Sequence, residues 1–89
     1  QKKIDAFCAN ATTPPKAKES SDIIFLDPPY NSGISAPTLL ALEKRGWISN
    51  KTTIFVETSS KEELKTPDSY VVSDVRNYGT TKVSTIKKA

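Results

Sequence analysis

The sequence contains no methionine, no histidine, a single cysteine and only three glycines. Without histidine and with Cys8 alone, the chain offers no ordinary zinc or transition-metal site and cannot form an intrachain disulfide. Gly33, Gly46 and Gly79 are far apart in the sequence, which excludes a glycine-rich phosphate or nucleotide loop. The longest apolar run, 23–26, is far too short to cross a bilayer. We therefore expect no bound metal, no membrane contact and a reducing, cytoplasmic location.

The chain has 89 residues, which is room for one small domain. Only 36% of these residues are hydrophobic, against about 45–50% in average globular domains, so the core must be small. Thirteen basic and ten acidic residues give a net charge of +3, which is compatible with nucleic-acid binding but is more typical of solvated chain ends. Because the sequence opens on Gln1 and lacks methionine, we expect an internal piece of a longer protein or a chain whose start was removed.

The pattern of apolar residues predicts an α/β domain. The run 22–26 is continuous, β-branched and aromatic, which is typical of a strand buried on both faces in a parallel sheet. The order of elements predicts parallel strands followed by an antiparallel hairpin, with too few helices to cover both faces of the sheet. The predicted elements are strands at 4–8, 22–26, 52–56, 70–75 and 82–87, a helix at 36–45, a short helical turn at 60–64 and a hairpin turn at 77–80.

The most informative segment is Asp27-Pro28-Pro29-Tyr30, directly after a predicted buried strand. In α/β proteins, ligands bind at the carboxyl ends of parallel strands. Both prolines have a fixed φ and no N–H, so the segment is rigid and rich in hydrogen-bond acceptors. An acidic side chain, bare carbonyls and an aromatic face suit a planar partner with an NH₂ edge. The alternative is a strand that merely ends in a proline-rich turn, with Tyr30 as packing cover.

This segment resembles the (Asp/Asn)-Pro-Pro-(Tyr/Phe) motif of class I S-adenosylmethionine-dependent methyltransferases that act on exocyclic amino groups. Further matches narrow the resemblance to the RsmD-like family, which methylates N2 of a guanine in 16S ribosomal RNA. The resemblance covers nearly the whole chain and implies a Rossmann-like class I methyltransferase fold. The further matching segments are Gly46-Trp47, Ile54-Phe55-Val56-Glu57, Arg76-Asn77-Tyr78-Gly79-Thr80-Thr81 and Ser84.

The resemblance implies roles for individual residues. Asp27 and the Pro28 carbonyl would accept hydrogen bonds from the target amine, and Tyr30 would stack on the base, with Pro29 completing the catalytic motif. The cofactor, S-adenosyl-L-methionine, would be contacted by Asp27 and by Asn10-Ala11, which resembles the family's Asp-Ala element.

Three charged residues have a role that the sequence leaves open. Glu57 ends a predicted strand near the same edge and is interpreted as structural more readily than functional. Arg76 and Lys82 could reach RNA phosphate or simply solvate the hairpin.

The family's glycine-rich cofactor loop and its acidic ribose-binding residue are absent from this sequence. We therefore expect residues 1–89 to be a partial methyltransferase domain, the C-terminal half, inactive alone and completed by an N-terminal half of the same enzyme. The expected partner is 16S ribosomal RNA or the small ribosomal subunit, and a homodimer is possible. Two alternatives stay open: a DNA adenine-N6 methyltransferase, and a non-catalytic RNA-binding remnant of the same fold.

Overall fold

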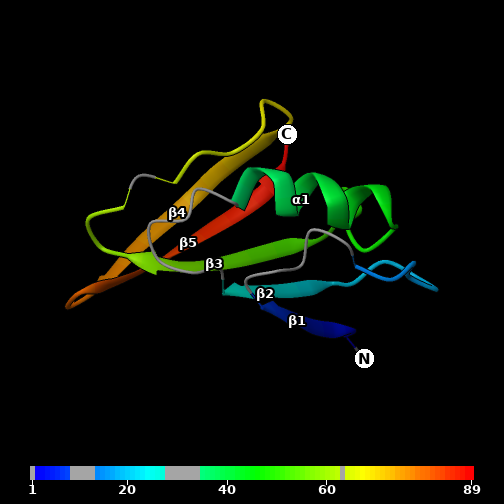
Figure 1. Cartoon of the computed structure of the whole chain (residues 1–89), viewed down its shortest axis with the longest axis horizontal. Helices are drawn as coiled ribbons and strands as arrows, with labels where there is room; N and C mark the ends of the chain where they lie inside the picture. Colours follow the sequence, from blue (N-terminus) through cyan, green and yellow to red (C-terminus); the bar gives the residue numbers. More distant parts are fainter. Residues whose placement is uncertain (1, 9–13, 28–34, 63) are drawn as a thin grey trace.

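A computed structural model describes residues 2–8, 14–27, 35–62 and 64–89. In this part of the chain one helix packs on a five-stranded sheet (Figure 1). The strand order across the sheet is β1-β2-β3-β5-β4. Strands β1, β2 and β3 are parallel, whereas β5 is antiparallel to both of its neighbours. The elements are β1 (Ile4–Cys8), β2 (Ile23–Asp27), α1 (Ser35–Lys44), β3 (Thr53–Ser59), β4 (Tyr70–Tyr78) and β5 (Thr81–Lys88).

The predicted α/β arrangement, with parallel strands followed by an antiparallel hairpin, is confirmed. One expectation is wrong: β2 is buried on one face only. Its side chains alternate, with Ile24 and Leu26 fully covered and Phe25 between them 49% exposed. The continuous apolar run was interpreted as covered on both faces, but the described residues contain a single helix, and this helix covers one face. We call the opposite side the open face of the sheet.

The core lies between α1 and the face of the sheet that it covers. Alternate residues of β2 and β3 point into this layer, as the period of two in a strand requires. Phe7, Trp47 and Leu64 are partly buried and pack against its margin. The buried apolar residues are Ile24, Leu26, Leu39, Leu42, Ile48, Ile54, Val56, Tyr70 and Ile86.

Helix α1 ends as the sequence predicts, at a glycine. Gly46 has a φ of 89°, a left-handed conformation that residues with a Cβ rarely adopt. Its N–H bonds the Glu43 carbonyl and the Trp47 N–H bonds the Leu42 carbonyl, which is the hydrogen-bond pattern of a Schellman C-cap. This turn brings Ile48 back into the core. In the described segments, no helix is both long enough and apolar enough to cross a membrane.

Strands β4 and β5 form a hairpin that is longer than predicted. The turn contains only Gly79 and Thr80, and Gly79 has a φ of 66°, as the first position of a two-residue type I′ or II′ turn requires. Because the turn is this tight, pairing continues to Tyr78 opposite Thr81. The sequence pattern had ended the first of these strands at residue 75.

The helical turn predicted at 60–64 is not formed in the described residues of that segment. A single turn is closed by the Glu62 N–H on the Ser59 carbonyl. The Ser60 N–H bonds the Thr80 carbonyl of the hairpin. Because this hydrogen bond connects the segment to the neighbouring hairpin, the segment does not continue as a helix.

A hydrogen bond between Tyr70 and Glu43 connects β4 to α1. The Tyr70 hydroxyl donates to the Glu43 carboxylate at 2.7 Å, and Lys88 Nζ lies 3.3 Å from the other carboxylate oxygen. The hydroxyl is the main cause that lowers the pKa of Glu43 below its usual 4.5. Burial, with Glu43 beside it, raises the pKa of Tyr70. The hydrogen bond between Tyr70 and Glu43 therefore holds the C-terminal end of α1 against β4.

We expect Tyr70→Phe to reduce the free energy of unfolding by about 1 kcal/mol, because the buried ring stays while a hydrogen bond to a partly exposed carboxylate is lost. A carboxyl group whose pKa is lower in the folded than in the unfolded state stabilises the fold at pH values above the unfolded-state pKa. This stabilisation is lost as the pH falls through the folded-state pKa. The wild type should therefore lose this contribution below about pH 4.5. Urea unfolding at neutral pH and at pH 3 should show the two proteins converging in acid. An unchanged difference at pH 3 would contradict the assignment.

Candidate functional site

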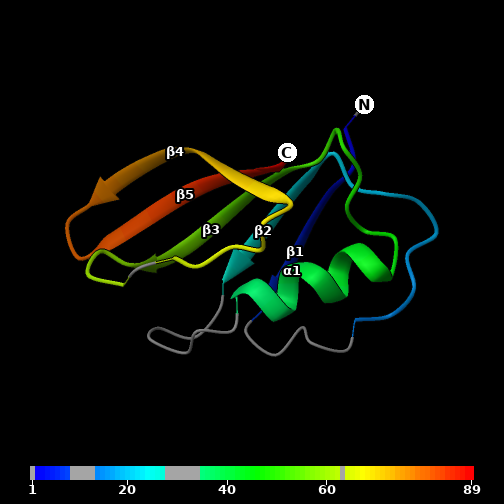
Figure 2. The same cartoon turned by 90° about the horizontal axis from the view of Figure 1, so that it is seen from above.

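The carboxyl ends of the parallel strands and the turn of the β4–β5 hairpin lie at one edge of the sheet. In Figure 1 the arrows of β2 and β3 point toward the side on which the β4–β5 hairpin turns. Seen from above, the same ends lie together (Figure 2). The carboxyl ends of parallel strands are where α/β proteins bind their ligands. Asp27 is the last residue of β2 and therefore lies at this edge.

Asp27 lines a recess of about 310 Å³ on the open face, which we call the Asp27 recess. Phe25 and Phe55 provide aromatic walls, with their ring centroids 5.3 Å apart and their planes inclined by 21°. Asp27 is exposed, so its carboxylate is available to a ligand. The residues that line the recess are Phe25, Leu26, Asp27, Phe55, Glu57 and Val83.

Glu57 lies beside Asp27 on the neighbouring strand. Leu26 pairs with Val56, so the next residue of each parallel strand, Asp27 and Glu57, lies at the same level. Both side chains point to the open face, because the alternate positions face the helix. The recess therefore combines an apolar aromatic wall with two carboxylates. Such a set accepts hydrogen bonds from an amine and gives a flat apolar surface to a planar ring.

Of the residues that the sequence indicated for catalysis and cofactor binding, the structure describes Asp27. The other predicted site residues are Pro28, Pro29, Tyr30, Asn10 and Ala11, and they lie outside the described residues. The roles that the resemblance implies for them stay predictions.

The structure separates the two hairpin cations that the sequence left undecided. Val83 pairs with Glu57 on one side and with Arg76 on the other, so Arg76 belongs to the same cross-strand row as the Asp27 recess. Lys82 precedes Val83 and therefore points to the opposite face. Of these two cations, Arg76 lies on the open face with the predicted site and Lys82 does not.

The sequence pattern did not indicate the aromatic walls of the Asp27 recess. Phe25 belongs to the run expected to be buried on both faces and Phe55 to the predicted strand at 52–56, yet both lie on the open face. One signal could have found them. With a single predicted helix, one face of the sheet had to stay uncovered, and the alternate residues of its strands had to line that face.

Comparison with known proteins identifies the family. The profile of the family described as conserved hypothetical protein 95 matches residues 2–87. The chain is similar to the ribosomal RNA small subunit methyltransferase D of Buchnera aphidicola, with 35% identity over 57% of this chain and 27% of the relative. It is also similar to the protein of the same name from Escherichia coli, with 33% identity over 68% of this chain and 28% of the relative. The chain thus spans little more than a quarter of the length of these relatives.

A solved structure supports the fold. The chain matches the crystal structure of a proposed methylase from Haemophilus influenzae with a TM-score of 0.67 and 21% identity. The match covers 89% of this chain and 49% of that structure. The arrangement of parallel strands followed by an antiparallel hairpin is therefore that of a Rossmann-like methyltransferase fold. With the family profile spanning almost every residue, the chain belongs to the conserved hypothetical protein 95 family, which is the RsmD-like methyltransferase family.

Proposed function

We propose that the full-length protein containing this chain transfers a methyl group from S-adenosylmethionine to the exocyclic N2 amine of a guanine in 16S ribosomal RNA. The observation that carries this proposal is the position of Asp27. It starts the Asp-Pro-Pro-Tyr motif, ends a parallel strand and lines a recess with aromatic walls. The name of both relatives, ribosomal RNA small subunit methyltransferase D, supports the same substrate class.

In this proposal the motif acts by positioning the target amine. The Asp27 carboxylate and the Pro28 carbonyl accept the amine hydrogens and so direct the nitrogen lone pair toward the methyl donor. An exocyclic amine is not basic. In this proposal, alignment of its lone pair with the methyl donor therefore contributes more to the rate than removal of a proton by a strong base would. Tyr30 stacks on the base, which must leave its own stack to enter the site.

In this proposal the chain supplies only part of the cofactor site. The methyl donor carries the reactive sulfonium methyl group, and in the proposal Asn10-Ala11 and Asp27 contact it. The described residues that line the Asp27 recess are apolar or acidic, and none of them is a donor for the carboxylate of the cofactor's methionine part. The sequence also lacks a glycine-rich loop. We propose that residues 1–89 are the C-terminal half of the domain and that an N-terminal half of the same enzyme supplies those contacts.

A consequence is that the 89-residue chain should not bind S-adenosylmethionine tightly by itself. Titration calorimetry of this chain with S-adenosylmethionine should give no saturable heat in the micromolar range. The full-length protein, titrated under the same conditions, serves as the positive control. Micromolar binding by the 89 residues would overturn the proposed division of the site.

The substrate is tested by methyl transfer from tritiated S-adenosylmethionine. Small ribosomal subunits from cells that lack the enzyme should accept label in the presence of the full-length protein, and duplex DNA should not. Digestion of the labelled RNA to nucleosides should place the label in N2-methylguanosine. Label in N6-methyladenine of DNA would support the alternative adenine methyltransferase. Absence of transfer to either substrate, with RNA binding retained, would support a non-catalytic RNA-binding module.

A further inference from the structure

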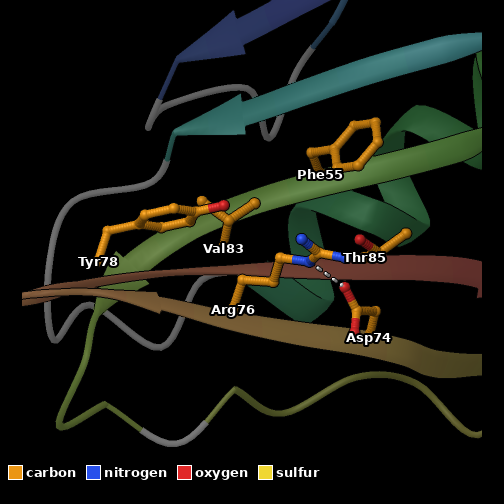
Figure 3. Close-up of a pocket in the computed structure, with 6 residues that line it drawn as sticks. All are labelled: Phe55, Asp74, Arg76, Tyr78, Val83 and Thr85. Carbon is orange, nitrogen blue, oxygen red and sulfur yellow. Dashed lines mark hydrogen bonds and ion pairs between the residues drawn. The ribbon is translucent and has the colours of Figure 1, made fainter.

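A second recess lies on the open face beside the Asp27 recess, and we call it the hairpin recess. It has a volume of about 390 Å³ and lies over β3, β5 and β4 (Figure 3). Its floor consists of Phe55, Val83 and Thr85, and its outer wall consists of three alternate residues of β4. The residues that line it are Phe55, Asp74, Arg76, Tyr78, Val83 and Thr85.

The two recesses are adjacent. Phe55 and Val83 line both of them. Arg76 and Asp27 lie in one cross-strand row, separated by three steps between strands. At about 4.8 Å for each step, their backbones are roughly 14 Å apart, a distance that a short stretch of single-stranded RNA can span. The hairpin recess can therefore receive a nearby nucleotide of the same RNA strand whose target base lies at Asp27.

The side chains of the hairpin recess offer two kinds of contact to a nucleotide. Tyr78 is 61% exposed, and an exposed aromatic ring in a recess gives a base a face on which to stack. The Arg76 side chain is 72% exposed, and a guanidinium binds phosphate oxygens through two parallel hydrogen bonds. The β4–β5 turn is tight, so both side chains stand on a paired strand rather than on a loose loop.

In the free protein, the guanidinium of Arg76 forms an ion pair with Asp74. Arg76 Nε donates to the Asp74 carboxylate at 3.0 Å, the bond drawn in Figure 3, and this contact raises the pKa of Arg76. The Asp74 side chain is 52% exposed, and an exposed ion pair contributes little stability. A phosphate can therefore replace this partner with little loss. Asp74 orients Arg76 along the recess in the free protein and competes with phosphate for it.

We propose that the hairpin recess binds the RNA nucleotide that flanks the target base, with Arg76 on its phosphate and Tyr78 stacked on its base. This inference rests on the proposed function, since it assigns a second subsite of the same RNA substrate. It also gives Asp74 an inhibitory role, because its carboxylate repels RNA and holds the guanidinium.

The test uses the full-length protein and four single variants. Arg76→Ala and Tyr78→Ala should each raise the Kd for a short, fluorescently labelled single-stranded RNA by about tenfold. Asp74→Asn should lower that Kd several-fold. Lys51→Ala is the matched control, because it removes one exposed positive charge in the turn before β3, at the opposite end of the sheet, and should leave the Kd unchanged.

Salt dependence and steady-state kinetics separate a contact to RNA from a loss of folding. Arg76→Ala should reduce the slope of log Kd against log salt by about 1, whereas Tyr78→Ala should not. On small ribosomal subunits, both variants should raise KM with kcat unchanged. Equal Kd values for Arg76→Ala and Lys51→Ala, or weaker binding by Asp74→Asn, would overturn the inference. A wild type that binds RNA through Arg76 but transfers no methyl group would overturn the proposed function and leave the binding site standing.

Discussion

Replacing Asp27 with alanine in the full-length protein is expected to lower kcat for methyl transfer by about 100- to 1000-fold, a loss comparable to that of one preorganised hydrogen bond at a reacting centre. Alanine offers no acceptor to the target amine, so its lone pair is no longer held toward the methyl donor. The side chain is exposed at the end of β2, so the substitution should leave folding intact. Transfer of tritiated methyl groups to small ribosomal subunits measures kcat, and RNA binding should stay within about twofold of the wild type.

Asp27→Asn distinguishes positioning from proton abstraction. The asparagine oxygen still accepts a hydrogen bond, whereas an amide cannot take a proton as a base. Positioning therefore predicts that Asp27→Asn keeps much more activity than Asp27→Ala, and a general base predicts that both variants fail equally. Asp68→Asn is the matched control, because Asp68 is an exposed carboxylate just before β4, at the far end of the hairpin from its turn. If Asp27→Ala retains wild-type kcat, Asp27 has no part in the reaction.

The sequence predicted the fold well where local signals and tertiary packing agree. Gly46 ends the helix in a left-handed conformation, and Gly79 forms a two-residue turn, because both positions require a residue without a Cβ. The parallel strands followed by an antiparallel hairpin come from the order of apolar runs and turn residues. Strand length was predicted less well, since β4 continues to Tyr78 through pairing with β5. That pairing is a long-range property, and no pattern within 70–78 reveals it.

The site was predicted in part for a related reason. The Asp-Pro-Pro-Tyr motif identified Asp27 from four consecutive residues. Phe25 and Phe55 were missed because an apolar side chain in a strand looks the same in sequence whether a helix covers it or not. The association of Arg76 with the open face depends on the register of β5 against β3 and β4. Register is set by the turn and by the packing of the whole sheet, so a single strand does not reveal it.

The thin core of this chain makes its stability sensitive to single truncations of α1. Leu42 is fully buried between the helix and the sheet, whereas Leu40 on the same helix is 49% exposed. We expect Leu42→Ala to lower the free energy of unfolding of the 89-residue chain by about 2–5 kcal/mol, the sum of lost transfer energy and the cavity left behind. Leu40→Ala should change it by less than about 0.5 kcal/mol.

The two substitutions make a matched pair, because each replaces leucine with alanine in one helix and so changes helix propensity by the same small amount. Their difference in urea midpoint therefore measures burial against the sheet. In a domain of this size each kcal/mol moves Tm by about 4–8 °C, so Leu42→Ala should unfold at least roughly 6 °C below Leu40→Ala. Equal losses for both variants would show that α1 does not pack through Leu42. A large loss for Leu40→Ala alone would place the opposite side of the helix against the sheet.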